Sequence, residues 1–387
     1  MNCRSCNVPV SRKLLSLGTI PFVNNLLAHP LEPYESGPLD LMYCEACSLG
    51  QLAEVVPGEK LFREYVFYSS VMAPVVKRAH DLASEVLYDS RPLTVIEIGS
   101  NDGYLLEFYR LAGVNVLGID PARGPANRAA RKGIPTIQEF FSLELAKTLP
   151  HADVIHANNV LAHSPDPNDI VAGFAQILKP LGGTCIVEVP YLGDLARNAQ
   201  FDTVYHEHIF YFSEKSISQL FNRHGLYVKR IDHLPDVLGG SIRVFASKSH
   251  LQCGIEDYGL DELSTLQARA NNNADRLNKE LSAYKGKTIW GFGAAAKATV
   301  MLNYCGIDES VITAIADDTP AKQGKFIPGT GIQVRSTEDW LKAQPDVTCI
   351  FAWNYAETIM SRYVDKYTGK FITSLPLEQS EAMVARA

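Results

Sequence analysis

Twice along the chain, an apolar run leads into a glycine-rich turn that is followed by a helical pattern. The first copy is TVIEIGSNDGYLLEFYRL at 94–111, and the second is KTIWGFGAAAKATVMLNYCG at 287–306. An alternation of strands and helices implies a parallel sheet with helices on both faces. The sequence therefore predicts an α/β protein in which two open-sheet units follow one another.

Further apolar runs extend both units. In the first, NVLGID, ADVIHANN and GGTCIVEVP read as strands, with LYVKRIDH and SIRVFASK as closing strands; in the second, VITAIADD and VTCIFAWN do so. Segment 61–87 has apolar residues at helical spacing and is expected to form one or two helices. Segment 254–287 is expected to be a mostly helical link between the two units.

Charge and hydropathy exclude several classes of protein. The formal net charge is −7 and no run of Lys and Arg occurs, so a nucleic-acid partner is not expected. No stretch has the length of a membrane span, and the start MNCRSCNVPV lacks the apolar core of a signal peptide. We therefore expect a cytoplasmic protein that does not bind a membrane and whose thiols stay reduced.

Four cysteines form two C-x-x-C pairs near the start of the chain, namely Cys3 with Cys6 and Cys44 with Cys47. Each pair places two thiolates on one tight turn, and two such pairs complete a tetrahedral zinc site. Four unrelated cysteines are the alternative. Because no coordination position stays open, the zinc is expected to be structural. The isolated cysteines are expected to be small buried apolar residues: Cys185, Cys253, Cys305 and Cys349.

The first glycine-rich loop, EIGSNDG, has the features of a cofactor site. Gly99 and Gly103 allow the backbone to pass close to a ligand, and Asn101 lies between them. Asp120 ends the next strand, where an acid can accept both hydroxyls of an adenosine ribose. Glu97 has no role in an NAD site but suits the ammonium of methionine. A tight turn of an ordinary α/β protein is the alternative.

The spacing E-x-G-x-x-x-G in this loop departs from G-x-G-x-x-G and resembles the first motif of class I methyltransferases. Asn158 and Asn159 close the fourth strand, where such folds place groups around adenine and the methyl donor. Ordinary loop polarity is an alternative for each of these two residues. The cofactor prediction is S-adenosylmethionine, with these two asparagines among its contacts.

The segment DTVYHEHIFYFS, at 202–213, is the most unusual in the chain. It follows a strand and should lie over the carboxyl ends of the sheet, where open α/β folds bind ligands. Several titratable side chains in a row are costly to bury unless they pair or function. A metal site of His206, Glu207 and His208 is less favoured, because three consecutive side chains do not share one face of a strand or a helix. We therefore interpret the segment as catalytic.

Over essentially its whole length the sequence resembles the bacterial C-methyltransferases that methylate C3 of nucleotide-linked 4-keto-6-deoxyhexoses, a step towards branched deoxysugars. The motifs that carry the resemblance are the two cysteine pairs, YVFYSS, EIGSNDG, VPYLGD, FDTVYHEHIFYFS, LGGSIR, GFGAAAK and DDTPAKQGKFIPGTGI. It implies three domains: a zinc-binding domain, a class I methyltransferase domain with a helical lid and a Rossmann-like fold, and a second Rossmann-like α/β domain that helps to hold the sugar nucleotide. Their expected bounds are 1–60, 61–253 and 254–387.

The resemblance also implies residue roles. Glu207, His208 and Tyr205 match active-site positions, with the histidine as the base, and Tyr68 matches an aromatic residue that closes over the site beside the cofactor. His206 is grouped with the substrate contacts without a firm role. The other expected substrate contacts lie in the last domain: Lys297, Lys322 and Asn354.

The chemistry agrees with these roles. A C–H bond next to a ketone can be deprotonated to an enolate, and a neutral His208 has a suitable pKa to take the proton. Glu207 would orient or polarise the imidazole, and Tyr205 would donate to the developing enolate oxygen. The enolate carbon would then take the methyl group of the sulfonium. A monomer or weak dimer is expected.

Several alternatives remain open at this stage. Methylation of oxygen or of C5 on a related sugar is the nearest. An NAD-dependent oxidoreductase could use the second loop, Gly291 to Lys297, followed by Asp317 and Asp318, but that loop could equally hold a pyrophosphate. A zinc-containing RNA methyltransferase conflicts with the negative charge, and a non-catalytic scaffold conflicts with the YHEH cluster.

Overall fold

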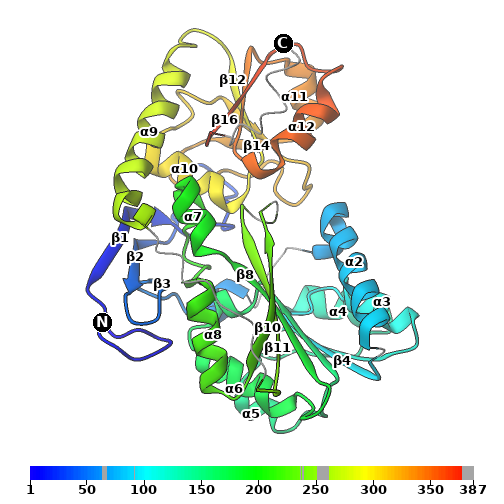
Figure 1. Cartoon of the computed structure of the whole chain (residues 1–387). Helices are drawn as coiled ribbons and strands as arrows, with labels where there is room; N and C mark the ends of the chain where they lie inside the picture. The colour runs from blue at the N-terminus through cyan, green and yellow to red at the C-terminus, as the bar shows by residue number, and fades with distance from the viewer. Residues whose placement is uncertain (63–67, 91, 236, 238, 251–260, 377–387) are drawn as a thin grey trace, which may run out of the picture.

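The fold was analysed in a computed structural model that describes residues 1–62, 68–90, 92–235, 237, 239–250 and 261–376. Within these residues the strands form three sheets: an N-terminal sheet, a central sheet and a C-terminal sheet. Figure 1 shows the C-terminal domain above the central domain, with the N-terminal strands along one side. The predicted α/β class with two open-sheet units is confirmed.

The central sheet has the order β10-β11-β8-β7-β4-β5-β6. Its strands are β4 (Thr94–Ile98), β5 (Asn115–Ile119), β6 (Thr136–Ile137), β7 (Val154–Asn158), β8 (Thr184–Pro190), β10 (Tyr227–Leu234) and β11 (Ser241–Ser247). The first five are parallel, but β11 is antiparallel to both β8 and β10, so the prediction of a parallel sheet is wrong at this edge. The physical reason is the short connection at 235–240, which can join only antiparallel neighbours.

Helices cover both faces of the central sheet, because its strands alternate apolar side chains between two cores. One face carries α2 (Ala73–Ser90), α3 (Leu106–Leu111) and α4 (Arg123–Arg131). The other carries α5 (Leu143–Ala146), α6 (Pro167–Ile177) and α8 (Glu214–Arg223). The predicted helical segment 61–87 corresponds to the end of α1 (Gly58–Phe62), a 3-10 turn at Ser69–Val71 and most of α2.

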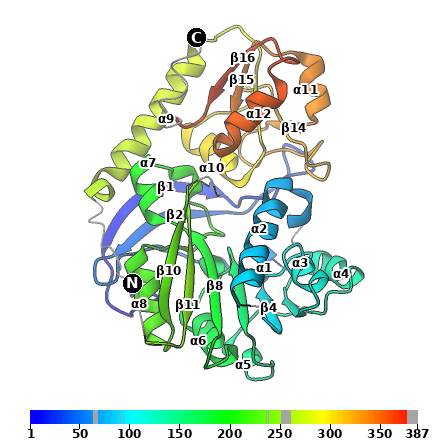
Figure 2. The same ribbon diagram turned by 45° about the vertical axis from the view of Figure 1, so that its right-hand side comes forward.

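The C-terminal sheet is wholly parallel and has the order β14-β13-β12-β15-β16. Its strands are β12 (Ile289–Phe292), β13 (Ala314–Ala316), β14 (Gln333–Arg335), β15 (Val347–Ile350) and β16 (Lys370–Thr373). One face packs on α9 (Leu266–Ser282) and α10 (Ala296–Cys305), and the other on α11 (Thr337–Ala343) and α12 (Ala356–Tyr363). Figure 2 shows α9 on one side of this sheet and α11 and α12 on the other.

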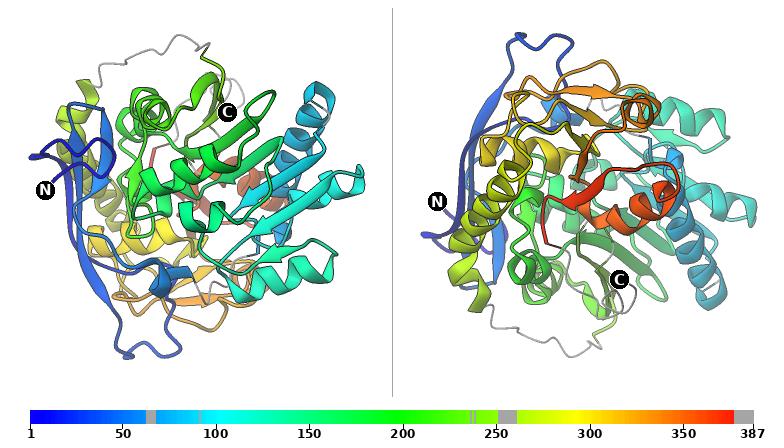
Figure 3. Two further views of the ribbon diagram at one scale, coloured as in Figure 1. Left: turned by 90° about the horizontal axis from the view of Figure 1, so that it is seen from below. Right: turned by 90° about the horizontal axis from the view of Figure 1, so that it is seen from above.

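The N-terminal sheet is antiparallel and contains β1 (Arg12–Pro21), β2 (Ser36–Cys44), β3 (Leu49–Leu52) and β9 (Phe210–Tyr211). The last of these strands belongs to the central part of the chain and follows the His-Glu-His segment directly. β1 also packs beside α9, where the Ser16 amide donates to Gln267 Oε1 over 2.7 Å (Figure 3). The N-terminal domain is therefore tied both to the His-Glu-His segment, through β9, and to the last domain.

Three of the isolated cysteines are buried apolar residues as predicted: Cys185, Cys305 and Cys349. The fourth, Cys253, and the first part of the predicted helical link, 254–260, lie outside the described residues. The described remainder of that link contains a 3-10 turn at Asp261–Thr265 and α9. Among the helices that the structure describes, none is long and apolar enough to cross a membrane.

Candidate functional site

The two C-x-x-C pairs converge at the edge of the N-terminal sheet. Cys3, Cys6, Cys44 and Cys47 place their sulfur atoms within 4.8 Å of one another. Two of the separations are 3.6 Å, between Cys3 and Cys47, and 3.5 Å, between Cys6 and Cys44. Metal–sulfur bonds of about 2.3 Å in a tetrahedron require sulfur separations of about 3.8 Å, so the cluster fits zinc. With four thiolates no position is left for water or substrate, which is the arrangement of a structural site.

The glycines of the first loop are required by geometry. Gly99 and Gly103 have φ angles of 67° and 74°, which favour glycine. A Cβ atom would lie 2.4 Å from a methyl carbon of Val160 at Gly99, and 2.4 Å from one of Ile134 at Gly103. The turn therefore packs tightly against the sheet and presents its backbone at the carboxyl end of β4.

Asp120 is bound to this loop by its carboxylate. Oδ2 accepts from the Asn101 amide and Oδ1 from the Ala122 amide, both over 2.8 Å. Burial raises the pKa of Asp120 and these two hydrogen bonds oppose it. Asp120 therefore holds the loop in shape. The Asn101 side chain has a further role, since its Oδ1 accepts from the Ser69 amide over 2.8 Å.

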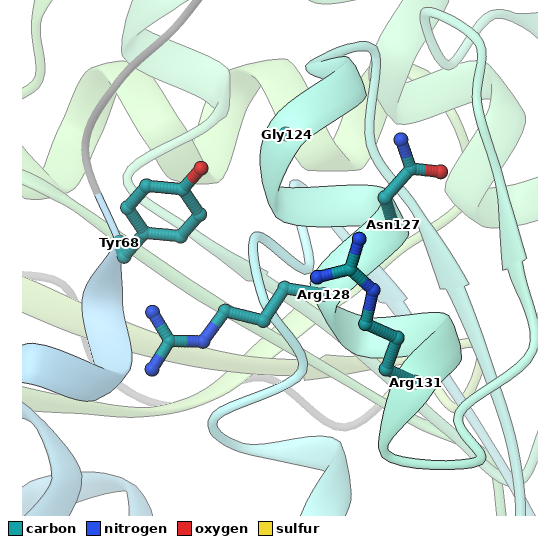
Figure 4. A pocket seen from close by; sticks show the side chains of 5 residues that line it. All are labelled: Tyr68, Gly124, Asn127, Arg128 and Arg131. Atoms are coloured by element: carbon teal, nitrogen blue, oxygen red, sulfur yellow. The ribbon is translucent and has the colours of Figure 1, made fainter.

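Tyr68 covers the start of α4, next to Asp120. Its hydroxyl approaches Gly124 so closely that a Cβ atom there would lie 2.7 Å away. The Arg128 guanidinium lies 5.2 Å from the centre of the Tyr68 ring. These residues line a cavity of about 650 Å³ together with Asn127 and Arg131, and Figure 4 shows the tyrosine facing the helix across it. Tyr68 therefore packs against the first turns of α4.

Buried oxygen atoms without donors gather at the carboxyl ends of β4 and β7. Within the described residues, both carboxylate oxygens of Glu97 and Oδ1 of both Asn158 and Asn159 have no hydrogen-bond partner. Burial raises the pKa of Glu97 well above its usual value, and the charges of Asp120 and Asp102 raise it further. Buried acceptors are normally satisfied, so this cluster calls for a ligand that brings N–H or O–H donors. An ammonium group fits that requirement.

Tyr205 and His208, two of the predicted catalytic residues, contact each other. The Tyr205 hydroxyl lies 2.9 Å from His208 Nε2, and the two ring centres are 4.1 Å apart. Burial lowers the pKa of His208 well below its usual value, and neighbouring charge on His163 and Lys297 lowers it further. The imidazole is therefore neutral at pH 7.

Glu207 faces away from this pair. Its Oε1 accepts a hydrogen bond of 2.9 Å from the Asn24 side chain, while its main-chain carbonyl lies 2.6 Å from His163 Nδ1. The His163 ring packs edge-on against His208 with ring centres 4.9 Å apart. Thus the prediction that the Glu207 carboxylate orients the His208 imidazole is not reflected in these contacts, because adjacent residues point to different sides. Burial raises the pKa of Glu207 to about 7, opposed by the Asn24 hydrogen bond.

Asn24 and His163 were not predicted from the sequence. His163 lies a few residues after β7, and a histidine just beyond the carboxyl end of a parallel strand is a signal that could have identified it. Asn24 lies in the connection between β1 and β2 and has no such signal, because its contact with Glu207 depends on tertiary packing.

His206 is held by the N-terminal domain. Its Nε2 lies 3.2 Å from the Gly37 carbonyl, and its ring packs edge-on against Phe22 at 4.8 Å. Only 3% of the residue is exposed. These contacts attach the His206 side chain to the N-terminal domain. In the described part of the chain the four cysteines are the one group that could hold a metal ion, so the His-Glu-His segment does not form such a site.

Two of the three residues expected in the last domain lie together beside the catalytic segment. Lys297 Nζ donates to Asn354 Oδ1 over 2.9 Å and lies 4.3 Å above the Trp353 ring. The Trp353 indole donates in turn to Asp202 Oδ2 over 2.7 Å. Burial lowers the pKa of Lys297 to about 8, opposed by the charge of Asp202. Burial raises the pKa of Asp202 to about 6.

Lys322, the third of these residues, serves the second glycine loop instead. Its Nζ donates to the Ala294 carbonyl over 3.0 Å and lies 3.2 Å from Asp317 Oδ2. Asp317 also accepts from the Ala294 amide over 2.9 Å. Lys322 therefore stabilises the loop between β12 and α10, and these contacts are separate from the network of Lys297 and Asn354.

Comparison with known proteins identifies three family models along the chain. Residues 3–62 match a model described as "Putative zinc binding domain", residues 62–231 match "Methyltransferase domain", and residues 236–376 match "C-methyltransferase C-terminal domain". The order of the three matches follows the order of the three sheets.

Individual relatives agree with these matches. The chain is 33% identical to the C-methyltransferase NovU of Streptomyces niveus over 97% of its own length and 95% of that protein. A shorter match, 33% identical, covers 23% of the chain and 39% of a ubiquinone biosynthesis O-methyltransferase of Salmonella paratyphi A. Among solved structures, the magnesium protoporphyrin IX methyltransferase of Synechocystis with bound SAM is 16% identical, with a TM-score of 0.36, over 45% of this chain and 79% of that one.

Proposed function

The chain belongs to the C-methyltransferase family, and on this premise we propose that it methylates C3 of a nucleotide-linked 4-keto-6-deoxyhexose with S-adenosylmethionine as methyl donor. The observation that carries the proposal is the contact of the half-buried Tyr205 with the buried His208, in the segment that follows β8 of the central sheet. A neutral imidazole beside a hydroxyl is the equipment needed to remove a proton next to a ketone and to stabilise the resulting oxyanion.

The first loop and its neighbours are suited to hold the methyl donor, which supplies an electrophilic methyl group on a sulfonium. Glu97 and the two asparagines at the end of β7, Asn158 and Asn159, offer the methionine ammonium buried acceptors that have no donor. Asp120 would accept the ribose hydroxyls with the lone pairs that its two backbone hydrogen bonds leave open. Tyr68 would cover the adenosine from the side of α4.

The deprotonation uses the catalytic segment. His208 takes the proton from C3, the C–H electrons pass into the adjacent carbonyl, and the enolate oxygen accepts a hydrogen bond from Tyr205. C3 then forms the bond to the methyl carbon as the methyl–sulfur bond breaks, which leaves S-adenosylhomocysteine. Since His208 Nε2 now contacts the Tyr205 hydroxyl, we expect the substrate carbonyl to replace the imidazole as the partner of that hydroxyl.

The nucleotide diphosphate would lie towards the last domain. Lys297 has a pKa of about 8, so it is mostly protonated at pH 7 and attracts an anion. Asn354 and Trp353 hold it beside the catalytic segment. Lys297 and Asn354 are therefore the proposed contacts of this domain with the substrate, and Lys322 acts by shaping the second loop.

The test is mass spectrometry of products from a panel of dTDP-, GDP- and CDP-linked 4-keto-6-deoxyhexoses incubated with S-adenosylmethionine. A gain of one methyl group on one member of the panel is expected. Substrate deuterated at C3 separates the neighbouring reactions, because C3 methylation releases the deuterium whereas methylation at C5 or on oxygen keeps it. Absence of a methylated product from every sugar in the panel would refute the proposal for these nucleotides.

A further inference from the structure

The connection between β1 and β2, residues 22–35, joins the N-terminal domain to the two others. Leu27 forms an antiparallel bridge with Phe326 of the last domain, with N–H···O distances of 2.9 and 2.8 Å. Val23 and Leu27 are buried, and Phe22 packs on His206. The connection is therefore fixed between the last domain and the catalytic segment.

Asn24 projects from this connection onto Glu207. Its Nδ2 donates to Glu207 Oε1 over 2.9 Å, across 183 positions of sequence. Asn24 has a φ angle of 59°, a left-handed conformation that asparagine tolerates better than most residues. Asn24 itself is exposed, whereas Glu207 is only 4% exposed. The loop thus places a neutral donor on a buried carboxylate of the active segment.

We propose that Asn24 is a positioning residue of the methyl transfer, and that the four-cysteine domain takes part in the reaction by holding the Glu207 carboxylate through it. A neutral amide fixes the direction of one carboxylate oxygen without adding charge, and it favours the ionised form of the acid. The carboxylate, rather than the imidazole of His208, receives this support. The proposal rests on the proposed function, because it assigns Asn24 to that same site.

The cysteine cluster and the Asn24 connection lie at opposite ends of the β1–β2 hairpin. Cys44 ends β2, the strand that pairs with β1, and the Asn24 connection runs between these two strands. The pairing of β1 with β2 holds both ends of the connection. The catalytic segment is also attached to this sheet, through β9 and through the contact of His206 with Gly37.

The test compares Asn24→Gly and Asn24→Asp with Asn25→Ala, a change at the exposed neighbour. Glycine removes the amide and still accepts the positive φ angle, while aspartate keeps the shape but, when ionised, cannot donate. Each change is made in the wild-type background and in Glu207→Gln. We expect Asn24→Gly to lower kcat about 10-fold in the wild-type background, in the range for a hydrogen bond to a charged group, and less than about 2-fold in Glu207→Gln.

Zinc content and affinity for S-adenosylmethionine are measured for every variant, and both should equal those of wild type. Suppose that wild type methylates its sugar and that Asn24→Gly and Asn24→Asp have the same kcat as Asn25→Ala. This result would overturn the role of Asn24 and leave the proposed function intact. An equal loss in both backgrounds would overturn the coupling to Glu207. A wild-type protein that methylates none of the 4-ketosugars would overturn the proposed function and, with it, this role.

Discussion

Replacement of His208 by glutamine removes the proposed base and keeps a carboxamide that can still bond to the Tyr205 hydroxyl. Of the proposed cofactor residues, Glu97 has no hydrogen-bond partner for its carboxylate within the described part of the chain, and Asp120 bonds to the backbone of Asn101 and Ala122, so neither is held by this pair. Affinity for S-adenosylmethionine should therefore stay the same. Turnover should fall by about 10²–10⁴, the range for a positioned general base.

The structure also supplies a rival base, which a pH profile separates from His208. Burial raises the pKa of Glu207 to about 7, so a reaction that used its carboxylate as base would speed up as the pH rises through about 7. His208 has a pKa well below 6.5, so a reaction that used its imidazole would already have reached its plateau at pH 6.5. In Glu207→Gln, which lacks the carboxylate that titrates near pH 7, we expect kcat/KM to be level between about pH 6.5 and 7.5, below the range in which Lys297 loses most of its charge.

The assay that isolates deprotonation is exchange at C3 in heavy water without a methyl donor. His208 is only 5% exposed, so slow exchange in wild type can reflect shielding from solvent, and the informative result is exchange in the variant. A His208→Gln protein that exchanges and methylates at nearly the wild-type rate would refute the assignment. A kcat/KM that rises through pH 7 and is lost in Glu207→Gln would make Glu207 the base.

Three further predictions follow from the other contacts. Cys44→Ser should lower both the zinc content, measured by metal analysis, and the unfolding temperature, measured by calorimetry. Wild-type protein that contains no zinc when it is purified without chelator would contradict this prediction. Asp120→Asn should weaken S-adenosylmethionine binding by about 1.5–3 kcal/mol in titration calorimetry, because it removes a charged acceptor and one partner of the loop amides; an unchanged affinity would place the cofactor elsewhere. Glu207→Gln should stabilise the fold by up to about 3 kcal/mol at pH 8, because burial raises the pKa from 4.5 to about 7 and ionisation above that range is unfavourable in the folded state. The gain in stability should shrink towards zero near pH 4.5. If the urea unfolding midpoints of wild type and Glu207→Gln were equal at pH 8 as well as at pH 4.5, this prediction would be contradicted.

Local features of the sequence were enough to find the main parts of the site. The spacing of the cysteine pairs determined a four-thiol cluster, since each pair occupies one turn and needs only to meet the other. The glycine loop after β4 could be recognised in the sequence, because positive φ angles and close packing require glycine at Gly99 and Gly103. Tyr205 and His208 lie three positions apart, so one turn of backbone brings them into contact.

The tertiary structure alone decided what surrounds these parts. Asn24 reaches Glu207 from a different domain, Asn101 turns to the Ser69 amide, and Lys322 bonds to its own loop and not to the catalytic segment. The pairing of β9 with β3, which joins the His-Glu-His segment to the N-terminal domain, could not be predicted from the sequence either. A sequence pattern records the periodicity and turn geometry of neighbouring residues, whereas these contacts depend on how separate elements pack. That packing directs the Glu207 carboxylate towards Asn24, while the imidazole of His208 contacts the Tyr205 hydroxyl.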